Sequence, residues 1–180
     1  MTRDELLDDL QGVREDVARY FASLPLEELY RSDGTSWAPV DDLRHLTRSV
    51  TLVTRGFGLP AEALRARFGA PAGPTRSRAE VGALALAGLA AGGKASPELI
   101  PDPVPESDRT DAFRAFCLDA WRAASLAFEE ILAAWPEEEL DRCQLPHPFL
   151  GMFSLREWVH FNVLHARHHV RVAERKLGRG

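Results

Sequence analysis

The feature that most constrains the fold is the spacing of the apolar residues, which recur every three to four positions along much of the chain. This period places the apolar side chains in one stripe along an α-helix, and no segment shows a convincing strand pattern. The chain is therefore expected to form long amphipathic helices. The stripe of the first helix, in residues 4–24, consists of Leu6, Leu10, Val13, Val17, Tyr20, Phe21 and Leu24.

Two further long helices are predicted in the interior of the chain. One begins near Pro39, whose fixed backbone angle suits a first helical turn, and extends to Phe57. The other begins around Ser107 or Asp108, both of which are good capping residues, and ends at Trp135. Their apolar positions again follow the helical period, so each helix buries one face.

A fourth long helix closes the chain. Ser154 can cap it, with Glu157 three residues later as the partner in a capping box, and the helical pattern extends to Leu177. Two short helices are expected over 60–69 and 80–92, in the long connection between the second and third long helices.

Four long helices joined in this way predict an all-α four-helix bundle with one long crossover between the second and third helices. We expect one domain over residues 1–180, because there is no internal repeat and no second core pattern. The segment LPHPFLGMF, residues 145–153, is expected to be a loop.

Composition excludes several kinds of partner. The formal net charge is −5, whereas nucleic-acid binders usually carry a basic excess, so nucleic acid is not expected as a partner. No stretch of 18 uncharged apolar residues is present, so no membrane span is expected. The two cysteines do not form a disulfide framework, and the N-terminus has no secretory pattern, so a cytoplasmic location is expected.

Three of the six histidines lie within residues 165–169, in the sequence LHARHHVRVAE. A helix turns about 100° per residue. With His165 set at zero, His169 lies at about 40° and Trp158 at about 20°, so both histidines are in the middle of the apolar face. His168 lies at about −60°, on the rim, and His160 lies at about −140°, facing away.

His45 is the only other helical histidine on an inward-facing stripe, which it shares with Ser49. A lone buried histidine is more often a satisfied core residue than a ligand, but three that converge are a different case. If the second and fourth helices are neighbours, His45, His165 and His169 meet. Three protein nitrogens with an open position are typical of a catalytic zinc-type site, and nickel, cobalt or iron would accept the same ligands. Asp41 and Asp42 lie one turn or less before His45, and either could orient its ring. The first expectation for both, however, is that they interact with the positive end of the helix dipole.

Three other active-site types do not fit the sequence. Di-iron bundles use two Glu-x-x-His motifs, and this chain has only Glu157 to His160. The H-E-x-x-H motif of zinc proteases is absent, with Ala166 where the glutamate would stand. No nucleophile elbow supports a Ser-His-Asp hydrolase.

Three stretches resemble a known family: SWAPVDDLRHLTRS (36–49), HPFLGMFSLREWVHF (147–161) and LHARHHVRVAE (164–174). They are similar to the motifs of the DinB-like superfamily, which includes the YfiT-type metal-dependent hydrolases and the bacterial thiol S-transferases. The resemblance implies an up-down-down-up bundle, often dimeric, with one divalent metal, zinc or nickel first, on His45, His165 and His169.

The resemblance also implies a chemistry. A metal on three neutral imidazoles lowers the pKa of a bound water or thiol. We expect, first, transfer of a low-molecular-weight thiol such as bacillithiol, mycothiol or glutathione to a small-molecule electrophile, and second, metal-dependent hydrolysis. His168 is the candidate general base, and Arg48 is the candidate clamp for the carboxylate of an acidic thiol.

A non-catalytic function is the alternative. The chain would then be a stress-related bundle protein, with or without bound metal. His147 and Cys143 both lie outside the long helices. His147 could line the pocket and Cys143 could be a reactive thiol, but loop packing is the first expectation for both.

Overall fold

The structure is a computed structural model that describes residues 1–32, 34 and 36–179. Four long helices dominate it: α1 (Arg3–Ser23), α3 (Pro39–Phe57), α6 (Asp111–Ala134) and α7 (Leu155–Lys176). The remaining elements are the helices α2 (Leu26–Leu29), α4 (Ala61–Phe68) and α5 (Arg78–Ala90), the 3-10 turns η1 (Pro97–Leu99), η2 (Glu106–Asp108) and η3 (Glu137–Asp141), and the strands β1 (Gln144–His147) and β2 (Gly151–Ser154).

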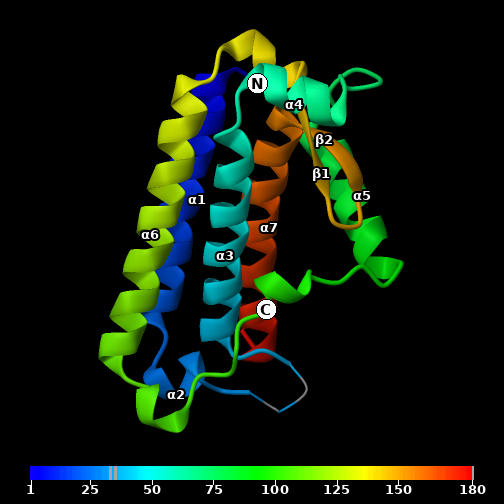
Figure 1. Cartoon of the computed structure of the whole chain (residues 1–180). Coiled ribbons are helices and arrows are strands. Elements are labelled where there is room, and N and C mark those ends of the chain that lie inside the picture. The colour runs from blue at the N-terminus through cyan, green and yellow to red at the C-terminus, as the bar shows by residue number, and fades with distance from the viewer. Residues whose placement is uncertain (33, 35, 180) are drawn as a thin grey trace.

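The long helices form a bundle in which α1 and α7 run in one direction and α3 and α6 run in the other (Figure 1). The chain returns from the end of α3 to the start of α6 through α4, α5 and the two 3-10 turns that follow, and within this crossover α5 lies beside α7 (Figure 1). The prediction of a four-helix bundle with a long crossover that contains short extra helices is therefore confirmed.

The helix starts follow from local chemistry. Pro39 occupies the first turn of α3. Ser154 accepts a hydrogen bond from the backbone N–H of Glu157, and the Glu157 carboxylate accepts one from the backbone N–H of Ser154, 2.8 Å away. This reciprocal capping box is the one that the sequence predicts, and it fixes the start of the helix that carries two of the candidate ligands.

The core lies between the four long helices and extends under the hairpin. Burying a large apolar side chain contributes about 1.5–3 kcal/mol, so the apolar side chains of this core dominate the stability of the bundle. The largest fully buried side chains are Phe21, Phe57, Phe128, Phe153, Leu6, Leu24, Leu29, Leu43, Leu64, Leu132, Leu140 and Leu155.

The predicted start of the third long helix was wrong. Ser107 and Asp108 lie in the 3-10 turn η2, and α6 begins at Asp111 with Thr110 as its cap. The Thr110 hydroxyl accepts a hydrogen bond from the backbone N–H of Phe113, 3.2 Å away. Thr110 is also a good cap residue, and the sequence offered three such residues within four positions.

The segment expected to be a loop contains an antiparallel β-hairpin. Gln144 is opposite Ser154 and His147 is opposite Gly151, where the backbone turns with a positive φ of 82°. The strands are only four residues long, and one contains Pro146, so no alternating pattern could reveal them. No helix in the described part of the chain is long and apolar enough to cross a membrane.

Candidate metal centre

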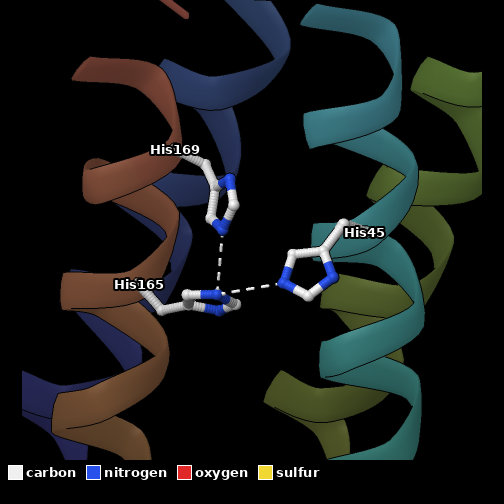
Figure 2. A group of neighbouring side chains, drawn as sticks. All are labelled: His45, His165 and His169. Atoms are coloured by element: carbon white, nitrogen blue, oxygen red, sulfur yellow. Dashed lines mark hydrogen bonds between the residues drawn. The ribbon is translucent and has the colours of Figure 1, made fainter. Parts of the chain in front are cut away.

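Two neighbouring helices bring three imidazoles to one point. His45 lies on α3, and His165 and His169 lie one turn apart on α7. The Nε2 atom of His165 is 3.2 Å from Nε2 of His45 and 3.1 Å from Nε2 of His169. Figure 2 shows the three rings pointing toward one another across the gap between the helices. A candidate ligand atom from each residue lies within 4.8 Å of the others.

The outer nitrogens of two of these rings are held by fixed acceptors. Nδ1 of His45 donates a hydrogen bond to the backbone carbonyl of Leu99, 3.0 Å away. Nδ1 of His169 donates to Oδ1 of Asp42 at 2.8 Å. Because each Nδ1 carries the proton, the neutral ring presents the lone pair of its Nε2 to the centre.

Burial keeps these imidazoles neutral. Loss of water around the partly buried His165 and His169 lowers the pKa of both rings well below 6.5, and the neighbouring imidazoles lower it further. Burial also lowers the pKa of His45, although the Leu99 carbonyl and the Asp42 carboxylate oppose that shift. Neutral imidazole is the form that binds a metal.

The donor set fits a divalent ion. Two Nε2 lone pairs face Nε2 of His165, and a single N–H on that atom could satisfy only one of them. Two nitrogens bound 2.0–2.1 Å from one tetrahedral ion are roughly 3.3–3.4 Å apart, close to the two separations observed. Three neutral nitrogen ligands suit zinc or nickel and leave at least one position open.

Asp42 connects the centre to the end of the chain. Its side chain is 1% exposed, and Oδ2 accepts a hydrogen bond from Nζ of Lys176 at 2.8 Å. Lys176 also donates to the backbone carbonyl of Trp37 at 2.9 Å. Burial raises the pKa of Asp42, and the ammonium group of Lys176 opposes this rise.

Both acids lie in the first turn of α3, and their side chains have different partners. Asp42 orients His169 on α7 rather than His45, its neighbour in sequence. Asp41 instead pairs with Arg44, 2.9 Å away. Lys176 was missed by the sequence reasoning, although it lies seven residues after His169 and thus on the same helical face.

A cavity of about 330 Å³ opens beside the three histidines. Its walls come from α3, α5, α7, the tip of the hairpin and the segment around η1. Trp37 covers part of the centre, with ring centroids 5.0 Å from His45 and 6.3 Å from His169. The three candidate ligands therefore face a space large enough for a small molecule.

Comparison with known proteins identifies the family of the chain. The family model of the DinB superfamily matches residues 9–173. The chain belongs to the DinB superfamily. No curated protein matches it.

Among solved structures, the fold of this DinB protein is similar to that of YfiT from Bacillus subtilis. The TM-score is 0.61 at 16% sequence identity, and the match covers 99% of this chain and 89% of that one. That structure is described as a probable metal-dependent hydrolase with an unusual four-helix bundle topology. At this identity the likeness establishes the shared fold.

His168 lies at the edge of the cavity. It is half-buried, and its ring centroid is 5.5 Å from that of His169. Burial lowers the pKa of His168, and Arg175 and Arg171 lower it further. A neutral imidazole at this place can accept a proton from a molecule in the cavity, and its role as general base stays a prediction.

Arg48 is directed toward the crossover and is not among the residues that line the cavity. Its Nη1 donates to the backbone carbonyl of Ile100 at 2.6 Å, and its Nη2 lies 3.9 Å from the carboxylate of Asp102. Arg171 is the arginine that does line the cavity. It stands one turn beyond His168 on α7, and the sequence reasoning missed it.

Two other histidines lie near the centre, and one of them differs from the expectation. His147 lines the cavity as well as packing its own loop, and its ring lies 4.6 Å from that of Phe161. His160 points away from His165 but is only 4% exposed, so the expectation that it faces out was wrong. The helical wheel gives its direction correctly, but it cannot show that the crossover and α1 cover that side of α7.

Proposed function

We propose that this DinB protein binds one divalent metal ion, zinc or nickel, through His45, His165 and His169 and uses it to hydrolyse a small-molecule substrate. The observation that carries the proposal is the convergence of three Nε2 atoms beside an open cavity, with two of the rings anchored through Nδ1. This arrangement leaves a position for substrate or water, as catalytic three-ligand sites do.

When bound, a divalent ion on three neutral imidazoles acts as a Lewis acid and lowers the pKa of a water or thiol that it binds. The chain supplies the other functions. Asp42 holds Nδ1 of His169, and Trp37 and the apolar walls restrict water around the reacting groups. A ring nitrogen of His168 accepts the proton that the reaction releases.

A thiol transferase is the second candidate, and one observation favours it. Arg171 and His168 stand at the lip of the cavity, and Arg171 makes no ion pair with any residue that the structure describes. The carboxylate of a low-molecular-weight thiol would meet these two groups while its sulfur reached the three histidines. In this proposal the carboxylate clamp is Arg171 instead of Arg48.

The test compares the wild-type protein with His45→Ala and with His160→Leu, which removes a histidine outside the centre. Zinc and nickel binding is measured by calorimetry on chelator-treated protein. Turnover is then measured with a panel of chromogenic esters and amides, and with a chromogenic electrophile plus each of several thiols.

We expect His45→Ala to lose metal binding and turnover together, and His160→Leu to keep both. Turnover that persists in His45→Ala would contradict a metal-dependent enzyme. If the wild-type protein binds metal but turns over none of the esters, amides or thiol–electrophile pairs, the result would favour the alternative of a non-catalytic metal-binding bundle.

A further inference from the structure

The cavity beside the three histidines has apolar walls that remain partly open to solvent. Leu52 on α3, Leu86 and Leu89 on α5 and Phe149 at the hairpin tip all line it, with exposures of 40%, 65%, 43% and 37%. They are four of the ten most exposed large apolar side chains in the described part of the molecule. Exposed apolar side chains gathered around one concave site mark a surface that binds something apolar.

Charge is confined to the lip of this cavity. Arg171 is the one lining residue, among those described, that carries a permanent charge. His147 lines the interior, and burial lowers its pKa to about 4, so its ring is neutral at physiological pH. Asn162 carries no charge, and one N–H of its Nδ2 donates to the carbonyl of Trp158 at 2.8 Å. Apart from a metal ion on the three histidines, the described residues of the interior therefore offer no counter-ion to a charged group.

Two glycines on and just after α5 allow the hairpin tip to form a wall of the cavity. A Cβ atom on Gly88 would lie 2.3 Å from Cδ2 of Leu150, and a Cβ on Gly93 would lie 2.5 Å from the ring of Phe149. Only glycine at these positions lets Phe149 approach so closely. The ring of Phe149 also packs edge-on against His147, with centroids 4.7 Å apart.

From these observations we infer that the cavity binds an uncharged apolar group, alkyl or aryl, that adjoins the reacting bond of the substrate. Ala85 on the α5 wall and Phe149 at the hairpin tip determine how large that group can be. This apolar group defines a substrate class for the proposed function, and the inference therefore rests on that function. The binding of the apolar group itself depends on the walls of the cavity and not on the metal.

The experiment uses the full chain in two forms, chelator-treated and zinc-loaded. The neutral fluorophore 1-aminoanthracene serves as the probe, and straight-chain alkan-1-ols of increasing length displace it. We expect affinity to rise about fourfold for each added methylene until the cavity is filled, and then to level off. The same rise is expected in both forms.

Two variants change the walls without touching a candidate ligand. Ala85→Phe fills the cavity, so we expect levelling off at a shorter alcohol and on the order of tenfold weaker binding of long ones. Leu86→Asp, at an exposed position, places a charge at the opening and weakens every alcohol, which keeps the test valid should Ala85→Phe misfold. Ala127→Phe, on the exposed side of α6, is the matched control and leaves all affinities unchanged.

The outcomes separate this inference from the proposed function. A wild-type protein that binds zinc but shows no dependence on alcohol length overturns the apolar cavity and leaves the metal centre standing. Alcohol binding that responds to Ala85→Phe, in a protein that binds no zinc or nickel, supports the cavity and removes the metal-dependent function. Alcohol affinities that are equal in Ala85→Phe, Leu86→Asp and Ala127→Phe would also overturn the inference. The inference would likewise be overturned if sedimentation runs showed that the protein self-associates and that this association covers the cavity.

Discussion

At the scale of single residues, Asp42 is the group on which the orientation of the centre depends. Its carboxylate accepts hydrogen bonds from His169 and Lys176 and is almost fully buried. Partners of this kind fix the tautomer and raise the basicity of a ligating imidazole. We expect Asp42→Asn to weaken zinc binding about 10–100-fold, measured by calorimetry.

Asp41→Asn is the matched control for this prediction. Asp41 is the neighbouring acid on the same helix, and its partner is Arg44. Its substitution should leave zinc affinity unchanged. Equal losses in the two variants would show that negative charge near the N-terminus of α3 matters and that the hydrogen bond to His169 does not.

His160 predicts how stability depends on pH. Burial, and secondarily the cations Arg78, the N-terminal amine and Arg156, lower its pKa to about 4 from an ordinary 6.5, against a small opposing effect of Asp9. Between these values the unfolded state takes up a proton that the folded state does not bind, so stability falls as pH drops from 6.5 to 4.

We expect His160→Leu to make this fall shallower, because the leucine binds no proton. The leucine also removes a buried Nδ1 that has no hydrogen-bond partner among the described residues. Thermal unfolding of chelator-treated protein at pH 5 and pH 8 provides the measurement. If the variant and the wild type lose stability in parallel between these values, the buried neutral state of His160 is not responsible.

The histidine triad was predictable from sequence, whereas its anchors were not. The wheel places His165 and His169 on one face because both lie on one helix of known period. Which α3 acid meets His169 depends on how two helices are rotated against each other, and this cannot be read from either one alone. The backbone carbonyl of Leu99 has no sequence signal at all, because every residue has one.

At the scale of secondary-structure elements, Arg76 joins the crossover to the start of α7 and to the hairpin through several hydrogen bonds. Its Nε and Nη2 donate to the carboxylate of Glu157 at 2.8 and 2.7 Å, and Nη2 also donates to the carbonyl of Met152 at 2.7 Å. The Glu157 side chain is 5% exposed, so losing this partner leaves a buried carboxylate poorly compensated.

We therefore expect Arg76→Met to destabilise the protein by about 1–3 kcal/mol, allowing for the partial exposure of Arg76. Amide hydrogen exchange should accelerate first in residues 70–92, which include α5. Arg122→Met removes an exposed ion pair with Asp119 and should change stability by less than about 0.5 kcal/mol. Exchange that accelerates uniformly over all four long helices would contradict a local role for Arg76.

The elements that sequence reasoning predicted well are those long enough to show a period. The four long helices and the short helices in the crossover follow their apolar spacing and caps. The hairpin is too short for alternation to be visible, and it exists because α5 and α7 offer it a surface. Its tip carries Phe149 into the cavity, so the least predictable element also determines part of the candidate site.

At the scale of the whole molecule, a metal ion would join two helices, α3 and α7, that are separated along the chain by the long crossover, α6, η3 and the hairpin. His45 belongs to α3 and the other two ligands to α7, so binding requires the folded bundle. A ligand that binds only the folded state stabilises it by about 2.7 kcal/mol at a free concentration 100 times its Kd. For a chain of this size that corresponds to a rise in Tm of about 5–11 °C.

Thermal unfolding with and without zinc checks this expectation. His45→Ala should lose the rise, because it removes the only ligand on α3, whereas Ala85→Phe should retain it, because the cavity wall is not part of the centre. An equal rise in His45→Ala would mean that zinc binds elsewhere on the folded protein. If the rise is lost in His45→Ala and kept in Ala85→Phe, the metal acts by linking α3 to α7, and the bundle topology itself brings the ligands together.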